Sequence, residues 1–191
     1  MNPYGHTKHM AERILDDYGK AYGLSWVALR YFNAAGADLD GEVGPDPRLA
    51  ASLIPRVVAA VLGAVPAFSV FGRNYDAPDG TAVRDFIHVA DIAAAHVAAL
   101  EYLELGGVPG PFNLGTGRGH SVQEVIVAAS RVLGVTVRTK DCPARPGDLA
   151  FMVANTNKAM THLNWSLTHS SLDEIVTSAA VWHKRWTTSA K

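Results

Sequence analysis

The sequence predicts an α/β fold, in which short strands alternate with longer helices. Short segments rich in β-branched and aromatic residues recur between longer segments whose apolar residues have helical spacing. Such alternation is typical of parallel sheets covered by helices. The composition agrees with a globular chain, because 48% of the 191 residues are hydrophobic and only 18% are charged, which is enough apolar material for a real core.

The first predicted elements are a helix at 3–22 and a strand at 25–32. Asn2 can cap the helix and Gly23 lies just beyond its end. The strand segment is short, apolar and aromatic, as expected of a buried strand. Residues 33–47 are rich in Gly, Asp and Pro. We expect them to form a long loop, of the kind that often serves function.

The remainder of the chain continues the same alternation. We expect helices at 50–63, 90–105, 121–133, 156–163 and 171–186. We expect strands at 68–71, 83–88, 112–114 and 135–139. Polar loops follow at 72–81 and 143–148. The helix at 121–133 has the strongest start signal, because Ser121 and Glu124 have the spacing of a capping box.

Charge and hydropathy exclude several classes of protein. The 17 basic and 18 acidic residues give a net charge of -1, so nothing favours nucleic acid or an anionic membrane as a partner. No apolar run approaches the roughly 20 residues that span a bilayer, and the first residues do not resemble a signal peptide. The single cysteine, Cys142, excludes an internal disulfide. A cytoplasmic protein is predicted.

A metal site is not expected. Eight histidines are present, but neither His6 with His9 nor His162 with His169 has a recognised ligand spacing. The acidic segment 38–42 lacks the pattern of a calcium-binding loop. We interpret it as a solvated loop.

Tyr4 and Lys8 form the most informative pair in the chain. They lie four residues apart in a predicted helix, so their side chains share one face. A lysine ammonium beside a phenol favours its deprotonated form, which suits proton abstraction from an alcohol. The same spacing also occurs in many helices without function. Because the pair stands at the start, we expect the chain to be the later part of a larger enzyme.

Further segments carry side chains suited to a nucleotide ligand. The guanidinium groups of Arg84 and Arg145 can make bidentate contacts with a diphosphate. Asn33 follows an apolar strand and can donate to a phosphate oxygen. Asp148 can accept hydrogen bonds from ribose hydroxyls. Each residue alone is also compatible with a structural role, and only their joint occurrence in this order points to a nucleotide site.

That order resembles the UDP-glucose (UDP-galactose) 4-epimerases, members of the extended short-chain dehydrogenase/reductase family. The resemblance covers the whole chain and rests on Asn-Pro-Tyr-Gly-x-x-Lys, Leu-Arg-Tyr-Phe-Asn, Gly-Thr-x-Val-Arg-Asp-Phe-Ile-His-Val and Arg-Pro-Gly-Asp-Leu. It implies the C-terminal part of a Rossmann-like, NAD-binding enzyme whose N-terminal βαβ part is absent. Residues 1–35 would end the NAD-binding domain. Residues 36–191 would form mainly the UDP-sugar-binding domain, with some elements returning to the Rossmann sheet.

The resemblance also implies roles for the matched residues. Tyr4 would be the general base that takes the proton of the sugar 4-hydroxyl, and Lys8 would bind the nicotinamide ribose of NAD. Phe32 would contact the nicotinamide end. The UDP-sugar would be bound by Asn33, Ser52, Leu53, Ser69, Val70, Phe71, Arg84, Arg145, Asp148 and Met152. The reaction would interconvert UDP-galactose and UDP-glucose through a transient 4-keto sugar.

Within that set, the resemblance divides the UDP-sugar among several groups. Asn33 and Arg84 would hold the diphosphate. Residues 69–71 would pack along the uracil, with backbone groups reading its edge. Arg145 and Asp148 would hold the phosphate and the uridine ribose.

Two positions depart from the family pattern. Ser52 stands where the family often has Asn or His, and serine reaches less far toward a diphosphate. Met152 stands at the position that gates the sugar pocket, and a large residue there favours UDP-glucose and UDP-galactose over N-acetyl sugars. The sequence leaves the exact sugar open.

Other functions remain open. The chain is alternatively a non-catalytic UDP-sugar-binding remnant, or part of a related nucleotide-sugar epimerase or dehydratase. We expect the isolated 191-residue chain to be inactive as an epimerase, because the Gly-rich phosphate loop of the NAD site is absent. A homodimer is a possible assembly, by analogy with the family.

Overall fold

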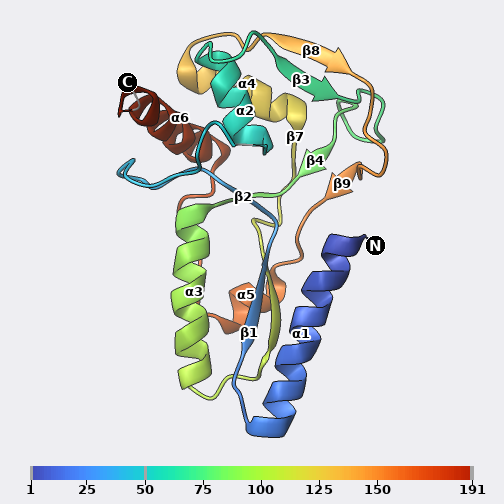
Figure 1. Ribbon diagram of the computed structural model, residues 1–191, viewed down its shortest axis with the longest axis vertical. Coiled ribbons are helices and arrows are strands. Elements are labelled where there is room, and N and C mark those ends of the chain that lie inside the picture. Colours follow the sequence, from blue (N-terminus) through green and yellow to red (C-terminus); the bar gives the residue numbers. More distant parts are fainter. Residues whose placement is uncertain (1, 50, 190–191) are drawn as a thin grey trace.

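The computed structural model describes residues 2–49 and 51–189, and its elements divide between two parts of an elongated molecule (Figure 1). In the first part, β1 (Val27–Tyr31) pairs in parallel with β6 (Gly110–Leu114). Three helices surround this pair: α1 (Pro3–Tyr22), α3 (Val89–Glu104) and α5 (Asn157–His162). Figure 1 shows α1 and α3 flanking the two strands from opposite sides.

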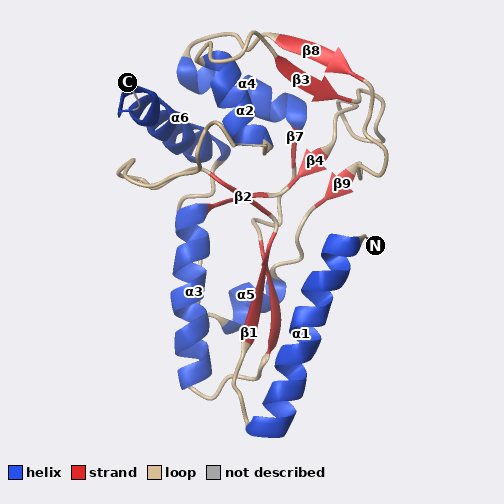
Figure 2. Cartoon of the chain, viewed as in Figure 1, coloured by secondary structure: helices blue, strands red, loops and turns tan. Residues whose placement is uncertain are grey.

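The second part combines small sheets with three helices, as the colouring in Figure 2 makes clear. β3 (Phe68–Phe71) pairs in parallel with β8 (Thr139–Cys142). β4 (Val83–Arg84) lies between β7 (His120–Ser121) and β9 (Phe151–Met152). The helices are α2 (Leu53–Val61), α4 (Val122–Leu133) and α6 (Leu172–Ser189).

A parallel strand pair joins the two parts. β2 (Asn33–Ala35) follows β1 almost directly and pairs with β5 (Phe86–His88), which leads into α3. Asn33 therefore lies just beyond the carboxyl end of β1, where the first part of the molecule meets the second.

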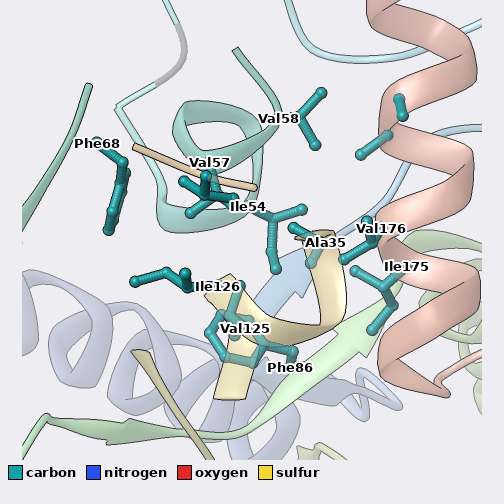
Figure 3. Close-up of a cluster of buried hydrophobic side chains, with 14 of the residues drawn as sticks. Ala35, Ile54, Val57, Val58, Phe68, Phe86, Val125, Ile126, Ile175 and Val176 are labelled. Atoms are coloured by element: carbon teal, nitrogen blue, oxygen red, sulfur yellow. The ribbon is translucent and has the colours of Figure 1, made fainter. Parts of the chain in front are cut away.

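The hydrophobic core has two clusters, one in each part. The larger lies among α2, α4 and α6, which present apolar faces to one another (Figure 3). Its members include Ile54, Val57, Val125, Ile126, Ile175 and Val176, of which Val125, Ile175 and Val176 have no exposed surface. The smaller contains Ile87, Phe112, Leu114 and Trp165 among others. The predicted domain boundary near residue 35 stays a prediction.

α1 is the exception to this burial. None of its residues is buried, and its apolar residues Met10, Ile14, Tyr18 and Tyr22 are all more than half exposed. An ion pair between Glu12 and Arg30 attaches the helix to β1. Hydrogen bonding from Arg30 holds the pKa of Glu12 below its usual range. Among the described residues, β1 pairs with no strand other than β6.

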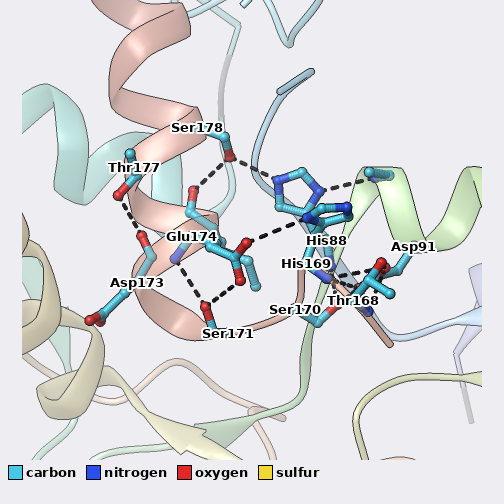
Figure 4. Close-up of polar contacts among 12 residues, drawn as sticks. His88, Asp91, Thr168, His169, Ser170, Ser171, Asp173, Glu174, Thr177 and Ser178 are labelled. Atoms are coloured by element: carbon cyan, nitrogen blue, oxygen red, sulfur yellow. Dashed lines mark hydrogen bonds and ion pairs between the residues drawn. The ribbon is translucent and has the colours of Figure 1, made fainter. Parts of the chain in front are cut away.

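A polar network fastens α6 to β5 and α3 (Figure 4). His88 is fully buried, and its Nδ1 accepts a hydrogen bond of 3.0 Å from the Ala90 amide. Nε2 therefore carries the proton and donates to Ser178 Oγ at 2.9 Å. This tautomer cannot take a proton from Ser178, so the pair is structural and not a nucleophile with its base.

Several sequence predictions are confirmed. The helix at 3–22 and the strand at 68–71 have the predicted bounds. The capping box is present, because Ser121 Oγ accepts from the Glu124 amide and Glu124 Oε2 accepts from the Ser121 amide. The part of the chain that the structure describes contains no helix long and apolar enough to cross a membrane.

Other boundaries were wrong for identifiable reasons. The predicted strand 83–88 divides at Asp85 into β4 and β5, which belong to different sheets. The predicted strand 135–139 does not form as such, because Val137 is buried in the larger core and its amide donates to Ser130 Oγ at the end of α4. The strand in this region, β8, begins only at Thr139. The predicted loop 33–47 begins with strand β2. The predicted helix start, Ala50, lies outside the described residues, and the helix begins at Leu53.

Candidate functional site

The structure gathers most of the predicted UDP-sugar residues around one pocket of about 240 Å³. We call it the arginine pocket. The predicted residues that line it are Asn33, Ser52, Leu53, Ser69, Phe71, Arg84, Arg145 and Asp148. They come from β2, the start of α2, β3, β4 and the loop after β8. Segments far apart in sequence therefore converge as the nucleotide hypothesis requires.

Asn33 supplies an unsatisfied group to this pocket. Its backbone amide donates to the Asp85 carbonyl at 3.0 Å, which fixes the residue at the start of β2. Its side-chain oxygen, Oδ1, is buried but has no hydrogen-bond partner within residues 2–49 and 51–189. A buried acceptor without a donor is costly. Asn33 is therefore suited to a ligand that supplies a hydrogen bond.

Arg84 is held at the pocket by backbone carbonyls. Its Nη1 donates to the carbonyls of Val83 and Leu149, each at 2.8 Å. These bonds use one terminal nitrogen and leave the rest of the guanidinium group for a ligand. The group is partly buried, which limits its movement.

Arg145 lies over an aromatic ring. The guanidinium carbon of Arg145 is 3.8 Å from the centre of the Phe71 ring, a cation–π contact. Phe71 and Ser69 face the pocket, because alternate residues of a strand point to the same side. Val70 points the other way and is 1% exposed in the larger core. Only the backbone of Val70 is thus placed to contact a ligand on the pocket side, and its predicted place along the uracil stays a prediction.

The lining of the arginine pocket is positively charged. It contains Arg56, Arg84 and Arg145 but only one acidic residue, Asp148. None of these arginines forms an ion pair with any residue that the structure describes. Uncompensated guanidinium groups around a pocket favour an anionic ligand with several oxygens, such as a diphosphate.

Sequence reasoning missed Arg56. It lies four residues after Ser52, so the two face the same side at the start of α2. The spacing from Ser52 was the signal that could have identified it.

An apolar hollow of about 510 Å³ adjoins the arginine pocket. The two share Asn33, Ser52, Leu53 and Phe86 in their linings. Its remaining lining includes Ala34, Gly36, Val43, Pro45, Val89 and Ala93. The strongly cationic pocket thus continues into a less polar space beside β2.

Tyr4 and Lys8 share a helix face, as predicted. Lys8 Nζ lies 5.4 Å from the centre of the Tyr4 ring. With Arg30 and Tyr31 among others, they line a hollow of about 500 Å³ between α1 and β1, the Tyr4 hollow. Neither side chain has a hydrogen bond or ion pair to another side chain among the described residues, and Tyr4 is 70% exposed.

The Tyr4 hollow and the arginine pocket have no lining residue in common. The N-terminal end of α1 points toward β4 and β9 (Figure 1). The predicted catalytic pair and most of the predicted nucleotide residues therefore line separate hollows.

Two more predicted residues do not line the arginine pocket. Phe32 lies between β1 and β2, where its amide bonds the Leu114 carbonyl at 2.9 Å. Met152 lies on β9, opposite Arg84 in the strand pairing, and its side chain is partly exposed. Within the described residues, no cluster of His, Cys, Asp or Glu has the geometry of a metal site.

The chain matches known proteins in sequence and in fold. The model of the NAD dependent epimerase/dehydratase family matches residues 1–115. A UDP-glucose 4-epimerase from Halalkalibacterium halodurans is 44% identical over 183 residues, covering 96% of this chain and 55% of that protein. Another, from Azospirillum brasilense, is 45% identical, covering 96% of this chain and 53% of the relative. The chain spans about half the length of these relatives.

Solved structures of UDP-glucose 4-epimerases are also similar to this chain. A UDP-glucose 4-epimerase from Brucella ovis in complex with NAD has a TM-score of 0.89 and 45% identity, covering 94% of this chain and 55% of that one. A UDP-glucose-4-epimerase from Stenotrophomonas maltophila, with bound NAD and formylated UDP-arabinopyranose, has a TM-score of 0.94 and 37% identity. That match covers 99% of this chain and 56% of the other.

Proposed function

The chain belongs to the NAD dependent epimerase/dehydratase family, and from that premise we propose that it is the UDP-sugar-binding part of a UDP-glucose 4-epimerase. The arginine pocket carries the proposal, because eight predicted UDP-sugar residues converge there around uncompensated guanidinium groups. In the complete enzyme the reaction interconverts UDP-galactose and UDP-glucose. The finer choice of sugar depends on residues near Met152.

Binding of UDP follows from the charges and donors of the arginine pocket. Arg84 and Arg145 contact the diphosphate, with Arg56 adding charge at the start of α2. The Asn33 carboxamide donates to a phosphate oxygen through Nδ2, and its unpartnered Oδ1 accepts from a hydroxyl of the sugar. Asp148 accepts from a ribose hydroxyl. Binding of the UDP portion in the arginine pocket therefore leaves the sugar free to extend beyond it.

Tyr4 and Lys8 supply the acid–base chemistry. Tyr4 takes the proton of the sugar 4-hydroxyl as the 4-keto sugar forms, and returns it when the alcohol is restored. The Lys8 ammonium lies 5.4 Å from the centre of the Tyr4 ring, so a cation and the phenol stand on the same helix face. The sugar must turn in the site between these steps, which requires a pocket that holds the nucleotide firmly and the sugar loosely.

The pair also suits a dinucleotide. An ammonium and a phenol that no other side chain of the described residues engages are donors of the kind that hold ribose hydroxyls. Tyr4, Lys8 and Phe32 would hold the nicotinamide end of NAD, which supplies reversible hydride acceptance when bound. We propose that residues 1–35 complete the NAD-binding domain and that 36–191 bind mainly the UDP-sugar.

Turnover and assembly need more than these residues. The 191-residue chain alone is expected to show no epimerase activity, because it contains no Gly-rich phosphate loop after a first strand. The exposed apolar residues of α1 suit a homodimer interface. A related epimerase or dehydratase reaction stays an alternative, as does a non-catalytic UDP-sugar-binding role.

Calorimetric titration of the 191-residue chain with UDP and with uridine tests the proposal. We expect binding of UDP and much weaker binding of uridine, because the arginines act on the diphosphate. Equal binding of both ligands, or no binding of UDP, would contradict a diphosphate site. Conversion of UDP-galactose to UDP-glucose by a full-length version, and not by a version with Tyr4→Phe, would exclude the non-catalytic alternative.

A further inference from the structure

We propose that Asp85 is the positioning residue of the arginine pocket, which sets Arg84 and Asn33 for a diphosphate ligand. The inference rests on the proposed function, because it concerns how that pocket is held. Asp85 follows Arg84 directly in sequence but does not line the pocket. It is fully buried, with 0% exposure.

The Asp85 carboxylate ties three segments together. Oδ1 accepts from the Thr116 amide at 2.8 Å and from the Thr116 hydroxyl at 2.7 Å. Oδ2 accepts from the Gly117 amide at 3.0 Å and from the Ala154 amide at 3.1 Å. A buried carboxylate with four donors is well satisfied. The turn after β6 and the segment after β9 are both anchored on this one side chain.

The backbone of Asp85 connects the same anchor to the pocket. Its carbonyl accepts from the Asn33 amide at 3.0 Å, and its amide donates to the Met152 carbonyl at 3.2 Å. The hydrogen bond from the Ala154 amide to the Asp85 carboxylate therefore holds the chain just after β9 close to the end of β4. That pairing places the Leu149 carbonyl where it accepts from Arg84 Nη1. Displacing Asp85 would thus shift both Arg84 and Asn33.

Gly115 shows how little space surrounds the carboxylate. A Cβ atom added at Gly115 would lie 2.6 Å from Asp85 Oδ2 and 2.6 Å from the Ala154 Cβ. Real Cβ atoms do not approach other atoms so closely, so Gly115→Ala must displace the carboxylate, Ala154 or both. This substitution disturbs the anchor without changing its charge.

Asp91 provides a matched control. It is also 0% exposed, and its carboxylate accepts bonds from the amides of Thr168 and His169 and from the hydroxyls of Thr168 and Ser170. It lines none of the hollows described above. Loss of its charge should therefore cost stability without moving the arginine pocket.

The experiment compares Asp85→Asn, Gly115→Ala and Asp91→Asn with the unsubstituted 191-residue chain. An asparagine at 85 turns an NH₂ group toward a backbone amide, so two donors face each other. We expect Asp85→Asn and Gly115→Ala to weaken UDP binding by about tenfold or more while weak uridine binding stays the same. Asp91→Asn should lower the melting temperature and leave UDP affinity unchanged.

NMR of the side chains provides a second measurement that does not need a ligand. The Arg84 Nε–H and Asn33 side-chain amide signals should shift in Asp85→Asn and in Gly115→Ala but not in Asp91→Asn. Unchanged signals in both folded variants, or equal shifts in Asp91→Asn, would overturn the inference. If the unsubstituted chain does not bind UDP, the proposed ligand is wrong, and these signals still decide whether Asp85 positions the pocket.

Discussion

The arginine pocket draws its lining from segments between residues 33 and 148, whereas Tyr4 and Lys8 come from one turn of one helix. The pocket stands beside the larger core, and none of its arginines forms an ion pair within residues 2–49 and 51–189. Tyr4 is 70% exposed on a helix that buries none of its residues. The same chain thus holds the predicted nucleotide residues beside a packed core and the predicted catalytic pair on an exposed helix.

The difference shows which function depends on which contacts. The proposed nucleotide binding needs side chains from distant segments, and packing in the second part of the molecule holds these segments together. The Tyr4–Lys8 pair needs only helix geometry to form, but its proposed catalytic role would need further contacts that bring the sugar and NAD to it. Binding and catalysis should therefore respond to different substitutions.

The largest expected effect is on turnover. In a full-length enzyme, Tyr4→Phe should lower kcat by roughly 10²–10⁴-fold, the usual contribution of a general base. UDP affinity should not change, because Tyr4 lines a different hollow. Steady-state rates and UDP titration check both halves of the prediction. An unchanged rate would remove Tyr4 from the chemistry.

Stability should respond to the larger core and not to α1. Ile54→Ala should destabilise the protein by about 2–5 kcal/mol, because Ile54 is 2% exposed in the larger core. Ile14→Ala on α1 is the matched control, since Ile14 is 55% exposed, and should change stability by no more than about 0.5 kcal/mol. Urea unfolding measures both. Similar losses in the free energy of unfolding for the two variants would mean that α1 is packed more tightly than its exposure indicates.

Arg145→Ala should weaken UDP binding about 10- to 100-fold, as expected for loss of a charge-assisted hydrogen bond of about 1.5–3 kcal/mol. Lysine keeps the charge but loses bidentate geometry, so Arg145→Lys should have an intermediate effect. Uridine binding tests the assignment, since its affinity should change less. A loss of turnover with normal UDP affinity would contradict the binding role.

The smallest expected effect is a dependence of stability on pH. Burial lowers the pKa of His88 and outweighs the Asp91 carboxylate, which acts to raise it. Below about pH 6.5 an unfolded histidine takes up a proton before the folded one does, so the free energy of unfolding falls with falling pH by at most about 1.4 kcal/mol per pH unit for this group.

The control for this dependence is His88→Gln, which cannot titrate. Thermal unfolding between pH 7.5 and 5 should show a smaller slope for the variant. Burial also lowers the pKa values of His120 and His183, so part of the slope will remain. An identical slope would show that His88 is not among the groups responsible.

Local signals were the most predictable part of the fold. Asn2 does cap α1, its Oδ1 accepting from the Gly5 amide at 2.8 Å, and Gly23 ends the helix in a left-handed conformation. Predictions that needed tertiary information were less successful. Asp85 divides a predicted strand because its carboxylate is required by segments that lie 31 and 69 residues away. No local pattern records such partners.

The sequence by itself determined the alternation of strands and helices, the Tyr4–Lys8 face and the residue types of the proposed nucleotide site, because spacing and capping act over a few residues. Tertiary structure alone decided that Arg56 joins the pocket, that Val70 faces the core and that Asp85 anchors its surroundings. Those outcomes depend on which segments pack together, and packing is settled by burial and hydrogen bonding across the whole chain.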